Sequence, residues 1–192
     1  MKTQKYLSIL GIFAASFLTL QACTGEQEKQ DNQDNQGTVA VSQPDTDIHT
    51  AAFMDNLSAV RQHIEAGTDL NKKDAYGSTP LMIAVTFGRT GVAELLIKGG
   101  ADLNITNNDG STALHSAAFL CRTEIVGMLL EAGADKSIRN NFGSTALESV
   151  SASFEDVRPV YDQFSRDLGP LGLKLDYAQL EKARPVIAGM LR

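Results

Sequence analysis

A short pattern recurs along the chain every 33 residues, and this recurrence constrains the fold more than any other feature of the sequence. The pattern is Gly-Ser-Thr-Pro-Leu or Gly-Ser-Thr-Ala-Leu, and it begins at Gly77, Gly110 and Gly143. A second pattern, in which glycine precedes aspartate by two residues, has the same period and ends at Asp69, Asp102 and Asp135. Two patterns with one period predict a stack of similar units, each of which buries its apolar face against its neighbours.

The residues that follow each glycine resemble the ankyrin repeat, whose signature is T-P-L-H-x-A. Segment 112–117 reads TALHSA and differs from the signature by alanine in place of proline, while segment 79–84 reads TPLMIA and differs by methionine in place of histidine. The resemblance implies an all-α ankyrin-repeat solenoid, with about four helix-pair repeats joined by hairpin-like turns. It also implies that the domain binds other proteins.

The period sets the expected boundaries of the repeats. Counting back from Leu81 reaches Ile48, which places a degenerate first repeat before the second one. The later repeats begin at Asp74, Asn107 and Asn140, and the fourth then departs from the pattern. We therefore expect ankyrin repeats over residues 46–154.

Individual residues predict where the helices begin and end. Thr79 is placed to accept hydrogen bonds at a helix N-terminus, with Pro80 at the first helical position, where a missing N–H costs nothing. Gly100 and Gly133 follow the second helices and supply the left-handed residue that ends a helix. Each repeat is therefore predicted to contain a turn and two antiparallel helices.

The two ends of the stack need polar outer surfaces. In the first repeat, Gln62 and His63 stand where later repeats carry apolar residues, and we expect His63 to be a solvated surface residue. Residues 155–192 are expected to form a C-terminal helical cap, in which the helix over 177–191 covers the last repeat and is kinked at Pro185.

The N-terminus has the features of an export signal. Lys2 and Lys5 precede an uncharged apolar run from Tyr6 to Leu20, so residues 1–22 are read as a signal peptide. The sequence Leu-Gln-Ala-Cys that ends at Cys23 resembles the bacterial lipoprotein box, which implies acylation of that cysteine. An ordinary cleaved signal that happens to end near a cysteine is the alternative. Among lipoproteins of this kind, Thr24 after the cysteine favours the outer membrane, facing the periplasm.

Residues 23–45 are rich in Gln, Asn and Asp and contain few large apolar side chains. Such a composition cannot bury enough surface to offset the entropy of ordering, which predicts a disordered tether. A chain of this length reaches roughly 25 Å, enough to hold a folded domain away from a membrane.

Charge and motif content narrow the possible functions. The formal net charge of −6 disfavours binding to nucleic acid. No nucleophile, phosphate-binding or metal-binding motif is recognisable in the sequence, so neither enzyme activity nor a cofactor or metal is expected. The chain is also expected to be monomeric. His49 and His115 occupy equivalent places two repeats apart, too far from each other to share a metal ion. The resemblance implies that this histidine instead bonds the loops of neighbouring repeats.

Cys121 is unusual because it replaces Gly88 of the preceding repeat, in a turn where a left-handed residue is typical. One interpretation is a small residue partly packed in the turn. The other is a thiol that senses oxidant, which would make the protein a redox-responsive regulator.

The family resemblance indicates which residues face a partner. In ankyrin stacks the hairpin tips and the exposed side of each first helix form a concave surface. Carried over to this sequence, the candidate protein-binding residues are Phe53, Met54, Tyr76, Phe87, Asn108, Asp109, Phe119, Leu120 and Phe142. Solvent-facing aromatic residues in a row suggest an interface, whereas the alternative is that the rings pack as additional core.

The resulting functional hypothesis is a membrane-anchored periplasmic module that binds one protein partner. Bacterial relatives of this type include immunity proteins that neutralise secreted toxins and factors that support enzymes such as catalases. The resemblance leaves both open.

Overall fold

The computed structural model describes residues 44–192, and every regular secondary-structure element within that range is a helix. The predicted signal peptide, Cys23 and nearly all of the predicted tether lie outside the described residues. The elements are α1 (Ile48–Phe53), α2 (Leu57–Glu65), α3 (Pro80–Thr86), α4 (Thr90–Lys98), α5 (Ala113–Phe119), α6 (Thr123–Glu131), α7 (Ala146–Ser151), α8 (Phe154–Leu168), the short 3₁₀ helix η3 (Gly169–Leu171) and α9 (Tyr177–Leu191).

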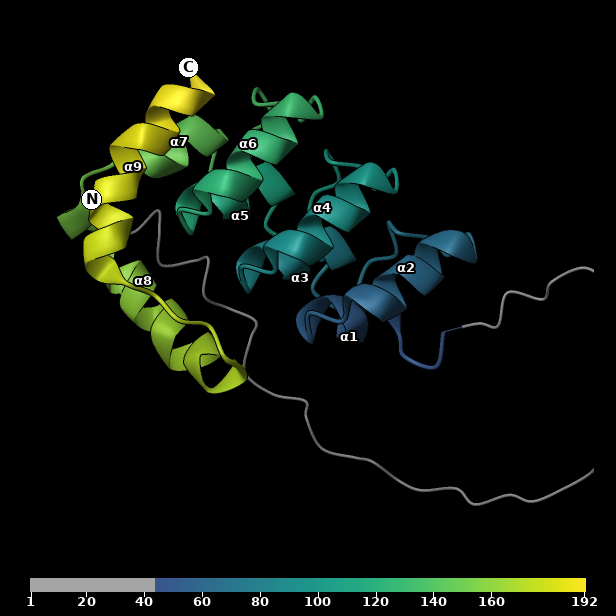
Figure 1. Ribbon diagram of the computed structural model, residues 1–192. Helices are drawn as coiled ribbons and strands as arrows, with labels where there is room; N and C mark the ends of the chain where they lie inside the picture. The colour runs from purple at the N-terminus through teal and green to yellow at the C-terminus, as the bar shows by residue number, and fades with distance from the viewer. Residues whose placement is uncertain (1–43) are drawn as a thin grey trace, which may run out of the picture.

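The helices form a stack of pairs, as the 33-residue period predicts (Figure 1). The first helices of the repeats, α1, α3, α5 and α7, pack side by side and are called the inner helices here. The second helices α2, α4 and α6 form a parallel row, called the outer helices. The fold class expected from the sequence is thus confirmed.

Alanine allows the inner helices to approach one another closely. Ala51, Ala84 and Ala117 occupy equivalent places at intervals of 33 residues, and none of them is exposed to solvent. Larger apolar side chains surround them, including Leu81 and Leu114, and the main core runs continuously along the stack. Because these side chains are small and fully buried, adjacent repeats can pack closely, as side chains do in protein interiors.

Each hairpin turn is held by one polar side chain. Oδ1 of Asp74 accepts hydrogen bonds from the backbone N–H groups of Tyr76 and Ser78, both at 2.8 Å. Asn107 and Asn140 do the same in the next two hairpins. These are Asx turns, in which a short side chain takes the place of a backbone acceptor.

Adjacent hairpins also bond to each other through the backbone. Asn108 N–H donates to the Tyr76 carbonyl, and Asn141 N–H donates to the Asp109 carbonyl. Gly110 makes this approach possible because its φ is +72° and a Cβ there would lie 2.6 Å from Oδ1 of Asn141. The contact between repeats therefore requires the glycine that begins the pattern at Gly77 and at Gly110, whereas a Cβ at Gly143 would meet no neighbouring atom.

The predicted helix ends are confirmed. The side chain of Thr79 accepts from Met82 N–H, with Pro80 at the first position of α3, and Thr112 and Thr145 cap α5 and α7 in the same way. Gly100 and Gly133 have φ values of +89° and +86°, in the left-handed region.

The fourth repeat has an insertion between its two helices. After α7 the chain forms α8, which has no counterpart in the earlier repeats, and only then forms α9. α9 packs against α7 and α6, where the outer helix of the fourth repeat would stand (Figure 1). Ile187, Ala188 and Leu191 of α9 join the main core, and the helix continues through the exposed Pro185. α9 therefore closes the stack.

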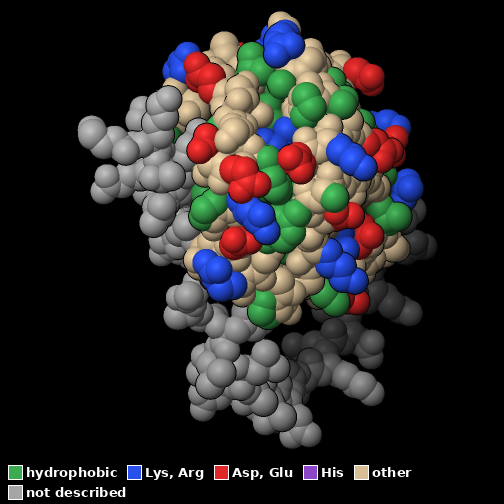
Figure 2. Space-filling view, turned by 90° about the vertical axis from the view of Figure 1, so that its left-hand side faces the viewer, with side chains coloured by type: hydrophobic (Ala, Val, Ile, Leu, Met, Phe, Trp, Pro, Cys, Tyr) green, Lys and Arg blue, Asp and Glu red, His purple; other side chains and the backbone are tan. Residues whose placement is uncertain are grey.

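α8 covers the C-terminal end of α5. Its buried residues Val157, Val160 and Tyr161 form a second apolar cluster with Phe119 and Leu120. The Tyr161 and Phe119 rings stack with their centroids 4.7 Å apart. On the side of the molecule formed by α8 and α9, acidic and basic side chains alternate with small apolar areas (Figure 2), as the outer surface of a cap requires.

The carbonyl groups at the ends of the inner helices receive side-chain donors. Arg89 Nε donates to the Phe53 carbonyl at 3.1 Å, and the equivalent Arg122 donates through Nη2 to the Thr86 carbonyl at 3.0 Å. The next equivalent residue is Glu155, which cannot donate. At that position the Tyr161 hydroxyl donates to the Phe119 carbonyl at 2.5 Å, so α8 supplies the missing donor.

Arg184 links α9 to this contact. It is only 3% exposed; its Nη1 donates to the Tyr161 hydroxyl and its Nη2 to the Ala152 carbonyl, both at 2.8 Å. One buried guanidinium thus fixes α9, α8 and the segment that leads from α7 into α8.

The histidines have structural roles. His115 Nε2 donates to the Ser144 carbonyl of the next repeat at 3.0 Å, and His49 Nε2 bonds the Lys72 carbonyl, as the resemblance implied. The expectation that His63 is a solvated surface residue is wrong. It is 6% exposed because its ring bonds the Thr46 carbonyl and the Thr68 hydroxyl, which cover it from both sides.

We predict that Asp74→Ala destabilises the stack by about 2 kcal/mol, because two backbone N–H groups of the hairpin lose their acceptor. Asp74→Asn is the matched control, since asparagine performs this task in the next two hairpins. Urea unfolding followed by circular dichroism measures both variants. Equal losses in the two would contradict the assignment.

We predict that Tyr161→Phe costs about 2 kcal/mol or more, because the Phe119 carbonyl and one Arg184 N–H group are left without their buried partner. Tyr177→Phe is the comparison, because the Tyr177 hydroxyl is half-buried and water can replace part of its bonding. If thermal unfolding shows Tyr177→Phe to be the more damaging change, the role given to Tyr161 is incorrect.

Candidate functional site

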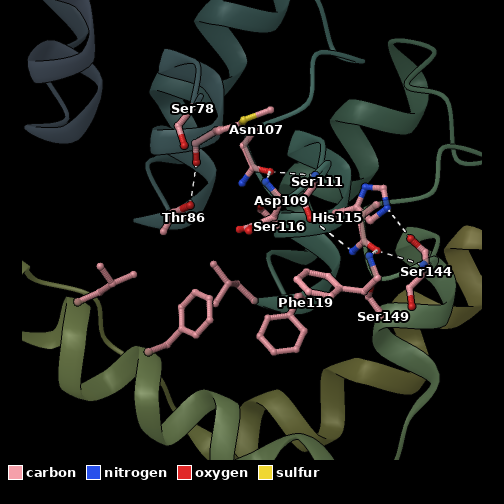
Figure 3. A pocket seen from close by; sticks show the side chains of 16 residues that line it. Ser78, Thr86, Asn107, Asp109, Ser111, His115, Ser116, Phe119, Ser144 and Ser149 are labelled. Carbon is pink, nitrogen blue, oxygen red and sulfur yellow. Dashed lines mark hydrogen bonds between the residues drawn. The ribbon is translucent and has the colours of Figure 1, made fainter. Parts of the chain in front are cut away.

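A groove lies between the hairpin turns, the inner helices and α8 (Figure 3). It spans repeats two to four and encloses about 120 Å³. A water molecule occupies roughly 30 Å³, and an apolar cavity of about 150 Å³ holds benzene, so the space suits one medium-sized side chain. We call it the groove throughout.

The groove exists because small residues stand where repeat two has a large one. Ile83 of α3 packs against the main core, whereas the equivalent residues of the next two repeats are Ser116 and Ser149. Both serines line the groove, together with Ser78, Ser111 and Ser144 from the hairpins (Figure 3). Five short polar side chains leave a hollow whose floor carries hydroxyl groups.

The remaining walls are apolar. Phe142 comes from the hairpin of the fourth repeat, and Phe164 and Leu168 come from α8. Phe119 also lines the groove, with its ring centroid 5.8 Å from that of Phe164. An apolar wall beside a polar floor is the usual construction of a site that binds one side chain and fixes its orientation.

Asp109 is the single carboxylate among the residues that line the groove. It is half-buried, and within the part of the chain that the structure describes no lysine, arginine or histidine forms an ion pair with it. Burial raises the pKa of the Asp109 carboxyl above its usual value, because the charged form has lost water without gaining a cation.

His115 is the other titratable residue of the groove, and it is already engaged. Burial lowers the pKa of its imidazole, while hydrogen bonds to the carbonyls of Ser144 and Ile138 act in the opposite direction. The ring is 3% exposed and its two nitrogens bond to Thr112 and Ser144. It supports the wall of the groove and is not a free base.

Of the nine residues predicted to bind a partner, four line the groove: Asp109, Phe119, Leu120 and Phe142. The prediction that Phe119 and Leu120 face solvent is nevertheless wrong. They are 8% and 2% exposed, because the apolar side of α8 covers them. They contribute to the wall of the groove and belong to the second apolar cluster.

Three other predicted residues lie at the ends of α1 and α3, where no helix covers them as α8 covers α5. Met54 is 64% exposed, and Phe53 and Phe87 are half-buried against each other, edge to face, with centroids 4.7 Å apart. They do not line the groove. The structure thus divides the predicted row of aromatic residues into two separate areas.

The last two predicted residues, Tyr76 and Asn108, lie in hairpins. Asn108 is exposed, and its Nδ2 donates to the Ala75 carbonyl. Tyr76 is half-buried, and its carbonyl accepts from Asn108 N–H. Both therefore hold neighbouring hairpins together at the rim of the stack.

Sequence reasoning missed Phe164, Leu168, Ser116 and Ser149 as parts of the site. A signal for the first two was present, because Val157, Val160, Tyr161, Phe164 and Leu168 recur at intervals of three and four residues and so predict an amphipathic helix. The signal for Ser116 and Ser149 was that both replace an isoleucine, Ile83, found at the equivalent position of repeat two.

Cys121 has a φ of +53°, as expected for the residue that replaces Gly88. Its Sγ lies 3.6 Å from the Leu180 carbonyl and packs against both apolar clusters. Burial raises the pKa of the Cys121 thiol, and the positive charge of Arg184 only partly opposes this. The reactive thiolate form is therefore disfavoured.

Over residues 44–192 no helix has both the length and the apolar character needed to cross a bilayer. In the same range, no three or more His, Cys, Asp or Glu side chains gather in a way that could hold a metal ion.

Comparison with known families agrees with the architecture. Residues 48–140 match the family model described as ankyrin repeats (3 copies). No curated protein matches the chain significantly. Ankyrin repeats generally act as modules for protein–protein interaction and are typically not catalytic. The match, the stack of helix pairs and the bonded hairpins together show that residues 48–140 are ankyrin repeats.

Proposed function

We propose that this protein is a protein-binding module that holds a segment of one partner in the groove. The observation that carries the proposal is the hollow at Ser116 and Ser149, which α8 encloses on one side with Phe164 and Leu168. A stack built for stability alone would carry an apolar residue there, as repeat two does at Ile83. An open site beside hydroxyl groups suits a side chain supplied by another molecule.

The proposed module is exported and attached to the bacterial outer membrane through an acylated Cys23, facing the periplasm. The support is the sequence alone: two lysines, an apolar run and then Leu20-Gln21-Ala22-Cys23. Several acyl chains together would anchor the protein firmly, since each buried methylene contributes about 0.8 kcal/mol. Residues 24–43 separate this cysteine from the described domain and would act as the spacer.

Binding through the groove needs neither a cofactor nor a second copy of the chain. The partner would be a protein of the same compartment, either a toxin that the module neutralises or an enzyme that it supports. The redox alternative finds no support at Cys121, because its thiol is half-buried and its pKa is raised.

We predict that Ser116→Ile abolishes partner capture. Isoleucine stands at the equivalent place in repeat two, so the stack should accept it while the side chain fills the groove. The full chain carrying an affinity tag is used to capture proteins from an envelope extract, which are then identified by mass spectrometry. Ser58→Ile, an identical change on the exposed face of α2, is the matched control.

The expected result is a protein retained by the wild type and by Ser58→Ile but lost, by at least tenfold, with Ser116→Ile. Thermal unfolding of both variants checks that the stack is intact. If Ser116→Ile captures the same protein as well as the wild type does, the groove is not the binding site. The identity of the captured protein distinguishes toxin neutralisation from enzyme support.

We predict that Cys23→Ser moves the protein from the membrane fraction to the soluble fraction and eliminates the incorporation of labelled palmitate. Cys121→Ser is the control and should change neither property, because Cys121 lies inside the folded domain. Membrane recovery and labelling that persist in Cys23→Ser would exclude the lipid anchor.

A further inference from the structure

We propose that the partner segment carries an apolar side chain next to a lysine or arginine, with the apolar group against Phe142 and Phe164 and the cation on the Asp109 carboxylate. This inference rests on the proposed function, because it names the chemistry that the groove recognises. Its basis is the charge and the wall composition of the groove itself.

Asp109 is held in place through its own backbone: its N–H donates to Oδ1 of Asn107 at 3.0 Å, and its carbonyl accepts from Asn141 N–H at 2.9 Å. The backbone is therefore fixed on both sides, and Asp109 remains among the groove-lining residues (Figure 3). A cation that binds there meets an acceptor whose backbone is already ordered, which reduces the entropy lost on binding.

The ion pairs of the described domain, such as Lys98–Glu94 and Arg139–Glu148, are exposed, and none of their residues lines the groove. None of them involves Asp109, and no lysine or arginine lines the groove. A half-buried carboxylate that the described domain leaves without a cation is complementary to a basic group on the partner.

Equivalent positions in three successive hairpins carry different side chains. Tyr76, Asp109 and Phe142 stand 33 residues apart, at the same place in three successive hairpins. The central one is an acid and the one beside it in the groove is aromatic. Since neighbouring hairpins bond directly to each other, the carboxylate and the ring lie in adjacent units. Adjacent residues of a partner segment could therefore reach both.

The experiment selects peptides from a displayed library of random 12-residue sequences on the immobilised full chain. Wild type and Ser58→Ile are expected to enrich sequences in which Lys or Arg adjoins a Leu, Ile, Met or Phe. Asp109→Asn should lose the basic preference, and Asp109→Lys should replace it with an acidic one. Asp109→Asn is expected to unfold no earlier than the wild type at neutral pH, because the amide does not carry the desolvated charge.

A synthetic peptide with the enriched sequence then gives the magnitude. Replacing its basic residue with Gln should weaken binding to the wild type by about tenfold, the effect of losing one charge-assisted hydrogen bond, and should leave binding to Asp109→Asn unchanged. The affinity of the original peptide for the wild type should fall as salt concentration rises.

The outcomes separate this inference from the proposed function. Peptides that bind Ser116→Ile as well as the wild type would overturn both, as would a wild-type selection that enriches nothing. Peptides that require the open groove but show the same charge preference on wild type and Asp109→Asn would overturn only the inference. A wild-type chain that self-associates in sedimentation, and that Ser116→Ile makes monomeric, would show the occupant to be a second copy.

Discussion

Each helix pair of the described domain has an apolar face that must be buried against a neighbouring helix pair or a closing helix. The fold therefore depends on how the last repeat is closed. Within the repeats the solution is uniform, with alanines between the inner helices and Asx turns that bond hairpin to hairpin. At the last repeat the chain inserts α8 before supplying the closing helix α9. Arg184 ties the two together from a buried position, where its N–H groups are satisfied by the Tyr161 hydroxyl and the Ala152 carbonyl.

The insertion has a consequence for the inner helices. Arg89 and Arg122 each neutralise the C-terminal end of the preceding inner helix, where unpaired carbonyls carry partial negative charge. The series stops at Glu155, which would be repelled by such an end. At the end of α5 the Tyr161 hydroxyl, a neutral donor, bonds the Phe119 carbonyl instead, and the Tyr161 ring stacks on that of Phe119. One helix therefore caps a carbonyl, extends the core and forms the outer wall of the groove.

These features explain how far the sequence could be interpreted. The period, the threonine caps and the glycines with positive φ are local, so they predict the repeats and their helix ends without knowledge of the tertiary structure. The burial of Phe119 and Leu120 is not local, because it depends on a helix that begins 35 residues after Phe119. The same residues would be exposed in a stack whose fourth repeat followed the pattern. Phe53 and Phe87, which no such helix covers, are half-buried.

The candidate site was predictable at its hairpin positions but not in its shape. Asp109 and Phe142 occupy hairpin positions that the repeat pattern identifies, but the hollow between them arises from Ser116, Ser149 and α8 together. Both the serines and the carboxylate act against stability, since they leave space unfilled and a charge partly desolvated. The neighbouring repeat shows that the stack accommodates a larger residue at the serine position. At these positions the chain carries residues that reduce stability, whereas a neighbouring repeat carries stabilising ones. The best explanation is that a group of another molecule binds there.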